Sequence, residues 1–310
     1  MPAPIAPPGD PALTAAAAAA AASSATGTAT GTASRARVVD AARLVYGVAA
    51  AAVGGMVVAA GDLGAVFQPV PRWIPLHRAL AYVSGSLLVA AGLALLAPER
   101  ARLVPRLTRL AALVLTADFL VWLLLLNAPT TATHASVMGA WEGCGLNMAV
   151  LAGAWILFAR SYAPAASRPA TSRARLVGEP GVTLARRIFA LGVPLVGLAH
   201  FADAQGATDY VPTWFPLRID WVYLTGAGHV AAGLAILFGV VPLLAATLEA
   251  AQITAFVVFS HIPAVIAAPT DRVQWGMLVY AVAIAASAWI VTATLPTRKG
   301  RPLPSRTHAR

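Results

Sequence analysis

Eight apolar stretches of about 20 residues constrain the fold of this 310-residue chain more than any other feature. A stretch of roughly 20 apolar residues is long enough to cross the hydrocarbon core of a bilayer as a helix. Only 11% of the residues are charged, against roughly 25% in soluble globular domains. Because lipid offers no hydrogen-bonding partners, each stretch must satisfy its backbone groups internally and therefore forms a helix. The sequence predicts an all-α membrane protein with eight transmembrane helices.

The predicted spans fall into two membrane units of four helices each. The first unit covers residues 37–160 and the second covers 184–296, with a cytoplasmic linker at 161–183. Residues 1–36 contain almost no large apolar side chains, which predicts a disordered cytoplasmic tail. Residues 297–310 form a basic cytoplasmic tail. The spans are expected at 38–60, 75–97, 106–127, 137–160, 184–204, 218–239, 243–264 and 274–295.

The arginines predict how the chain is oriented in its membrane. If the spans alternate, the arginines of both termini, of the linker and of the loop after the second span all fall on one side. The opposite side has only Arg72, Arg78, Arg218 and Arg272, together with several aspartates. By the positive-inside rule, both termini are expected to be cytoplasmic. The net charge of +10 does not indicate a nucleic-acid partner, because the arginines lie in separate loops and form no continuous basic face.

An internal repeat relates the two units. Val70–Leu96 and Val211–Leu237 align without a gap at an offset of 141, and 14 of the 27 aligned positions are identical. Beyond this segment the offset becomes 134, and Trp141 then aligns with Trp275 and Asn127 with His261. Each unit has four helices, an even number, so both copies enter the membrane in the same direction. This predicts a parallel repeat related by an axis along the membrane normal.

The repeated segment joins a Pro-Trp motif to a helix rich in small residues. Trp73 and Trp214 belong to the motif VPxWxP and are expected at headgroup level. There they either anchor the chain or form a rigid lid over a pocket. The helix that follows contains Gly85 and Gly92 in the first copy and Gly226 and Gly233 in the second. Small residues allow helices to approach closely inside a membrane, so this helix is expected at the centre of its unit.

Ionisable residues within the spans are the candidates for a functional site, because a charged group inside a bilayer is costly. They are Asp118, Glu142, His200, His229, Glu249 and His261. His229 is expected near the bilayer midplane, about 17 Å along its helix, and its counterpart in the first copy is Leu88. It is either a neutral histidine bonded to a neighbouring helix or a ligand or proton site.

The other histidines are expected nearer the outer face. By sequence alignment, the counterparts of His200 and His261 are Ala59 and Asn127. Bis-histidine haem ligation requires two imidazoles at matching depth, and His229 is expected to lie too deep to match either of them. The sequence has no close HxxxH or CxxC spacing, so no metal site is predicted.

The second unit resembles the DoxX-like family of four-helix integral membrane proteins. The resemblance rests on GLAHFADAQGATDYVPTWFP from Gly197, TGAGHVAAGLAIL from Thr225 and HIPAVIAAPTDRVQW from His261. It covers residues 184–295 and, more weakly, 38–160, which implies a tandem duplication of the unit. The family's TGxxE motif has His229 in place of the acidic residue, and Leu88 in the first copy. The resemblance implies a bacterial cytoplasmic (inner) membrane location and an association with redox processes.

Three functions remain open from the sequence. The first is an accessory or redox-associated membrane protein, with a membrane redox complex as partner. The second is a quinone-linked oxidoreductase subunit whose pocket is lined by His200, His229, His261 and Trp214. The third is a transporter of a small solute or of protons. No cofactor motif is evident, and quinone is the one candidate cofactor.

Overall fold

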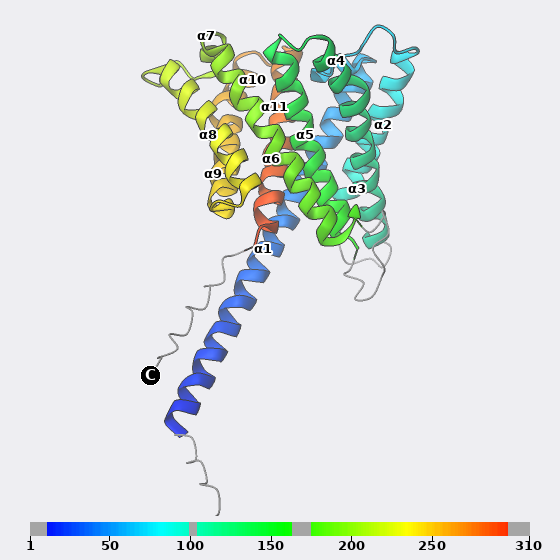
Figure 1. Ribbon diagram of the computed structural model, residues 1–310. Coiled ribbons are helices and arrows are strands. Elements are labelled where there is room, and N and C mark those ends of the chain that lie inside the picture. The colour runs from blue at the N-terminus through cyan, green and yellow to red at the C-terminus, as the bar shows by residue number, and fades with distance from the viewer. Residues whose placement is uncertain (1–10, 99–103, 163–174, 297–310) are drawn as a thin grey trace, which may run out of the picture.

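Eight helices that are long and apolar enough to cross a membrane run through the part of the chain that the structure describes. The structure is a computed structural model and describes residues 11–98, 104–162 and 175–296 (Figure 1). Those residues form helices and connecting turns, with no strand among them. The predicted fold class, an all-α membrane protein with eight spanning helices, is confirmed.

The first unit contains four spans. They are α1 (Pro11–Ala60), α2 (His77–Leu95), α3 (Val104–Val121) and α5 (Met138–Arg160). The third span continues from α3 through a π-helical turn, η2 (Trp122–Asn127), into α4 (Ala128–Thr133). A short 3₁₀ turn, η1 (Leu63–Val66), lies in the loop between α1 and α2.

The second unit repeats this order of elements. Its spans are α6 (Gly178–Ala202), α8 (Arg218–Phe238), α9 (Pro242–Phe256) and α11 (Arg272–Thr294). Here α9 continues through a π-helical turn, η5 (Val257–His261), into α10 (Ile262–Ala267). Two short turns, α7 (Ala204–Ala207) and η4 (Thr208–Tyr210), lie in the loop between α6 and α8.

The N-terminal segment differs from the sequence prediction. A disordered tail was expected over residues 1–36, but α1 begins at Pro11 and runs on into the first span. The segment Ala15–Ala22 is a run of alanine, the residue with the highest helix propensity, so a continuous helix is the physically reasonable outcome. Residues 1–10, the tail at 297–310 and most of the linker lie outside the described residues.

The two units share local backbone features at corresponding positions. Leu76 and Leu217, which lead into α2 and α8, both adopt the left-handed conformation with φ of 53°. Both π-helical turns end two residues before a proline, Pro129 or Pro263. Proline cannot bond to the carbonyl four residues earlier and crowds it, which accounts for the widened turn at the same place in each unit.

The packing of helices has the same pattern in both units. Within a unit, each span packs on the next one: α1 on α2, α2 on α3 and α3 on α5, then α6 on α8, α8 on α9 and α9 on α11. Between units, α5 packs on α6, α11 packs on α1, and α5 packs on α11. Gly153 of α5 lies against Ser287 of α11, its own counterpart at the offset of 134. This pattern is what a two-fold parallel repeat would produce, and the symmetry axis itself stays a prediction.

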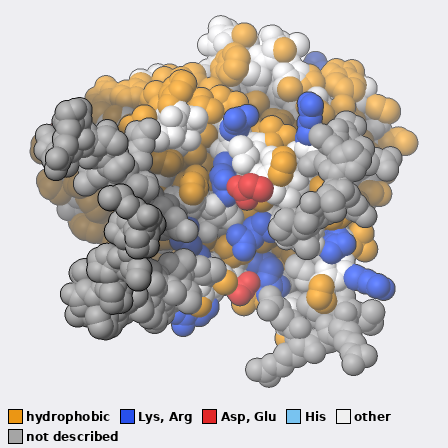
Figure 2. All heavy atoms as spheres, turned by 60° about the horizontal axis from the view of Figure 1, so that its bottom comes forward, with side chains coloured by type: hydrophobic (Ala, Val, Ile, Leu, Met, Phe, Trp, Pro, Cys, Tyr) orange, Lys and Arg blue, Asp and Glu red, His pale blue; other side chains and the backbone are white. Residues whose placement is uncertain are grey.

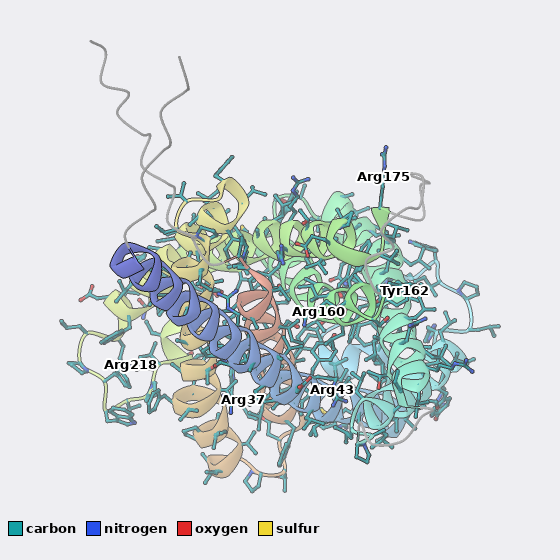
Figure 3. All side chains as sticks on the ribbon, turned by 90° about the horizontal axis from the view of Figure 1, so that it is seen from below. Arg37, Arg43, Arg160, Tyr162, Arg175 and Arg218 are labelled. Atoms are coloured by element: carbon teal, nitrogen blue, oxygen red, sulfur yellow. The ribbon has the colours of Figure 1, made fainter. Side chains whose placement is uncertain are left out.

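Arginines gather at one end of the bundle, and Figure 2, in which this end is turned forward, shows their side chains on it. This arginine-rich face is formed by the N-terminal part of α1 and by the ends of the spans that connect through the linker. Seen from below in Figure 3, it includes Arg37, Arg43, Arg160 and Arg175. Arg100, Arg102, Arg168 and Arg173 of the predicted set lie outside the described residues. The opposite face holds the Pro-Trp loops.

Glycines set the contact between the first two helices of each unit. A Cβ atom on Gly54 of α1 would lie 2.4 Å from the Gly85 carbonyl oxygen of α2, and one on Gly92 would lie 2.5 Å from that of Gly47. In the second unit, a Cβ on Gly197 of α6 would lie 2.6 Å from the Gly226 carbonyl oxygen of α8. Since backbone meets backbone here, any side chain would push the helices apart.

We expect Gly54→Leu to destabilise the first unit and Gly55→Leu to leave it unchanged. A Cβ on Gly55 would meet nothing within 4 Å, whereas one on Gly54 meets the backbone of α2. Overpacking of this kind costs about 1–3 kcal/mol. The measurement is the thermal midpoint of the detergent-solubilised protein. Equal midpoints for the two variants would contradict the packing described here.

Candidate functional site

The crossing of α6 and α8 brings His200 next to His229. A Cβ on Gly226 would lie 2.8 Å from the Cβ of His200, and a Cβ on Gly197 would lie 2.8 Å from that of His229. The two glycines therefore leave room for one imidazole from each helix. The two rings pack edge to face, with centroids 5.3 Å apart and an interplanar angle of 82°.

His229 forms a buried pair with Glu249 of α9. The distance between His229 Nδ1 and Glu249 Oε1 is 2.7 Å. The two residues are only 3% and 2% exposed. The other polar atom of each side chain, His229 Nε2 and Glu249 Oε2, is also buried and has no hydrogen-bond partner in the structure. Buried polar atoms are nearly always hydrogen-bonded, so two unpaired atoms on adjoining side chains suggest that they serve a ligand, a water molecule or a proton.

Half-buried side chains from α8 and α9 surround the pair. The ring of Phe256 lies 5.8 Å from the ring of His229 and 6.1 Å from that of His200. The Thr225 hydroxyl lies 3.3 Å from His200 Nδ1, and the Gln252 side-chain amide donates to the Thr225 carbonyl at 3.0 Å. The site therefore combines two imidazoles and a carboxylate with one aromatic ring.

Glu142 reaches this region from the first unit. It lies near the start of α5 and is half-buried. It is close enough to interact electrostatically with His229 and with Asp203, which follows the end of α6. Asp203 is exposed on the face with the Pro-Trp loops, so Glu142 is within electrostatic reach of that face as well as of the buried pair.

The first unit has an apolar pair in the place of His229 and Glu249. The repeat aligns His229 with Leu88 at the offset of 141 and Glu249 with Leu115 at the offset of 134. Both leucines are fully buried. The first exchange was predicted from the sequence, but no partner was predicted for Glu249. The second offset was the signal that could have found it, because both polar residues replace leucine in contacting helices.

The counterpart of His200 differs from the one expected. The sequence alignment gave Ala59, but Gly54 packs on Gly85 as Gly197 packs on Gly226. The offset between α1 and α6 is therefore 143, and His200 corresponds to Val57, which is fully buried. The expectation of Ala59 was wrong because the stretch from the glycine of the first helix to the glycine of the second is two residues longer in the first unit, Gly54 to Gly85, than in the second, Gly197 to Gly226.

Asp118 belongs to a separate polar cluster in the first unit. The Ser84 hydroxyl donates to Asp118 Oδ2 at 2.8 Å, and Trp122 Nε1 donates to Ser84 Oγ at 3.0 Å. Trp122 is only 1% exposed. The corresponding residues of the second unit are Thr225, Gln252 and Phe256. Asp118 therefore corresponds to Gln252, which lies beside the His229 pair, and to neither member of that pair.

The remaining predicted residues lie away from the buried pair. His261 is half-buried at the end of η5, and the ring contacts recorded for the described residues do not include it. Trp214 is 68% exposed in the Pro-Trp loop, where its ring contacts that of Phe215 with centroids 4.3 Å apart and an interplanar angle of 40°. The pocket expected to combine Trp214 with three histidines therefore reduces to His200 and His229, with Glu249 added.

The expectation that His229 lies too deep to match His200 was wrong. His229 and His200 were expected at different depths, but their rings are in contact. Depth counted along α8 misplaced His229, because Gly226, the ninth residue of α8, packs on Gly197, which lies only five residues before the end of α6. Two rings in direct edge-to-face contact still leave no space for a macrocycle between them. No group of three or more metal-ligating side chains occurs within the described ranges.

The pair can switch the hydrogen-bonding role of His229 Nε2. When histidine and glutamate share two protons, one lies between Nδ1 and Oε1 and the other makes Nε2 a donor. When they share one proton, it lies between Nδ1 and Oε1 and Nε2 becomes an acceptor. The pair can therefore deliver or accept one proton at a fixed atom, inside surroundings that exclude water.

Comparison with protein-family models, with curated proteins and with solved structures found no match to this chain.

We expect the double variant His229→Leu/Glu249→Leu to be more stable than either single variant. Each single change leaves one buried polar partner unpaired, which costs about 3–5 kcal/mol. The double change recreates the apolar pair of the first unit. A double-mutant cycle on the thermal or denaturant midpoint measures the coupling. Additive effects of the two substitutions would show that the residues do not act as a pair.

Proposed function

We propose that this chain is a redox-associated integral membrane protein whose second unit binds a quinone headgroup beside His229, Glu249 and His200. The observation that carries the proposal is the buried pair with two unpaired atoms, His229 Nε2 and Glu249 Oε2. The membrane location is supported by the eight apolar spans. Within this proposal the chain is a tandem DoxX-like protein of the bacterial cytoplasmic membrane, with the arginine-rich face cytoplasmic.

The residues of the site suit the chemistry of a quinone. A bound quinone supplies the exchange of two electrons and two protons that converts it to quinol. His229 Nε2 can donate a hydrogen bond to a carbonyl oxygen when the pair holds two protons and accept one from a hydroxyl when it holds one. Glu249 keeps the imidazole oriented through Nδ1. Phe256 offers an aromatic ring against which a flat headgroup can pack.

Access to the site favours the second unit over the first. In the most apolar 18 residues of the span from α9 to α10, 22% of the residues are buried inside the protein. In the corresponding part of the span from α3 to α4 the share is 44%. Phe256 is half-buried, whereas Trp122, at the same position of the first unit, is almost completely buried. A lipid-soluble ligand therefore has fewer side chains to pass at α9 than at α3.

The electrons exchanged with the quinone come from outside this chain in the proposed scheme. A membrane redox complex supplies or receives two electrons, and protons pass through the His229 pair one at a time. Glu142 is within electrostatic reach of both His229 and the exposed Asp203, and it is the residue we assign to proton exchange with the face that holds the Pro-Trp loops. The chain thus acts as the quinone-binding, proton-handling component of a larger assembly.

We expect purified wild-type protein to bind added ubiquinone and the His229→Leu/Glu249→Leu variant to lose that binding. The variant keeps the fold because leucines occupy these positions in the first unit. Asp118→Asn is the matched control, since it removes a half-buried carboxylate from the first unit and should bind as the wild type does. Binding is measured by co-elution of quinone and quenching of tryptophan fluorescence. Equal binding by wild type and double variant would refute the proposed site.

Proton conduction without a quinone is the second candidate function. It is favoured by the position of Glu142, within electrostatic reach of both the buried His229 and the exposed Asp203. In vesicles with an imposed potential, wild-type protein would then carry protons in the absence of any quinone, and His229→Leu would abolish the flux. Flux that requires added quinone would favour the first candidate instead.

A further inference from the structure

An open apolar cleft of about 400 Å³ lies between α1, α9 with η5, and α11. It is lined almost wholly by aliphatic side chains and by Trp289. The two polar side chains in its wall are bonded to each other, because Trp289 Nε1 donates to Thr254 Oγ1 at 3.1 Å. All of the lining residues belong to spanning helices. The cleft therefore lies at membrane depth and presents an apolar surface.

The corresponding seam on the other side of the molecule has larger side chains. That seam lies between α6, α3 with η2, and α5, which are the counterparts of α1, α9 and α11. At six of the ten lining positions the residue is larger there, for example Leu184 for Ala41 and Leu151 for Ala285. At one lining position, Val38, the corresponding residue of the other seam, Gly181, is smaller. The seam with the cleft thus has less side-chain volume than the other seam, which leaves room for the cleft.

Arginines lie directly below the cleft on the arginine-rich face. Ala41 and Val45 line the cleft from α1, and Arg37 precedes Ala41 by four residues, which puts it one helical turn lower on the same side of the helix. Arg37 is exposed and is labelled in Figure 3. Arg35 lies beside it and donates to the Leu295 carbonyl at 2.6 Å, which ties α1 to the end of α11. The corresponding positions of α6 hold Gly178 and Pro180, so the basic pair is also absent from the other seam.

We propose that this cleft is a lipid site that holds one acyl chain of an anionic phospholipid, with the headgroup phosphate at Arg37. An apolar cleft open to a bilayer is filled by hydrocarbon. The cation one turn below it selects a negatively charged headgroup, because a basic side chain at the membrane surface favours anionic lipid. The site is separate from the His229 pair, since Glu249 and Phe256 project from α9 toward α8 whereas Thr254 and Val257 project toward α1 and α11.

The test is retention of phospholipid by the full-length protein. The protein is reconstituted in vesicles of equal parts phosphatidylglycerol and phosphatidylethanolamine, extracted in mild detergent and examined by native mass spectrometry. Wild type is expected to retain phosphatidylglycerol preferentially. Ala41→Leu/Ala285→Leu, which restores the side chains of the other seam, should lose most of the bound lipid. Val48→Leu is the control on α1, because Val48 is exposed but does not line the cleft.

Arg37→Gln tests the headgroup contact by itself and changes only an exposed side chain. It should reduce the preference for phosphatidylglycerol about fivefold, equivalent to about 1 kcal/mol, while Arg187→Gln on the same face leaves it unchanged. Equal retention by wild type and the cleft-filled variant would overturn the site. Lipid retained without any preference for phosphatidylglycerol would overturn the headgroup assignment. Retention of a quinone or a protein helix in place of phospholipid would overturn the proposed occupant.

Discussion

The close approach of glycine backbones between the first two helices of each unit is the contact on which the rest of the structure depends. In the first unit it joins Gly54 to Gly85, and in the second it joins Gly197 to Gly226. Without a hydrophobic driving force between helices in lipid, such contacts gain their stability from close packing. In the second unit the same contact fixes the position of His200 relative to His229. The element that holds the unit together is thus also the element that assembles the candidate site.

Comparison of the two units supplies an internal reference for the chemistry of the site. The two units share the left-handed entries at Leu76 and Leu217, the π-helical turns and the order of helix contacts. Against this common framework the differences are informative. A buried pair of leucines in one unit is a histidine–glutamate pair in the other, and such a pair is rarely stabilising compared with apolar side chains of similar size. The cost of this pair in stability is a reason to look for a function that it serves. The cleft beside α1 likewise has smaller side chains than the corresponding seam, and this loss of packing is a reason to look for a ligand there.

The sequence was sufficient to predict the number of spans, the positions of most of them and the face on which the arginines gather. It was also sufficient to select His229 as the residue that distinguishes the copies. It was not sufficient to pair His229 with Glu249 or to show that His200 touches it. Depth counted along a helix misplaced His229 relative to His200, because the residues at which α6 and α8 pack, Gly197 and Gly226, cannot be read from residue numbers. Trp214 was expected in the pocket, but its loop holds it on the surface.

The sequence by itself determined that this chain is a bundle of membrane helices with an internal repeat, because lipid forces each apolar span to become a helix and because 14 of 27 positions are identical between Val70–Leu96 and Val211–Leu237. The tertiary structure decided which polar residues meet. His229, Glu249 and His200 come from three helices, and their contact depends on where glycines let those helices cross. The cleft between α1, α9 and α11 likewise arises from small losses of volume at six positions on three helices, and only their packing together turns those losses into a space.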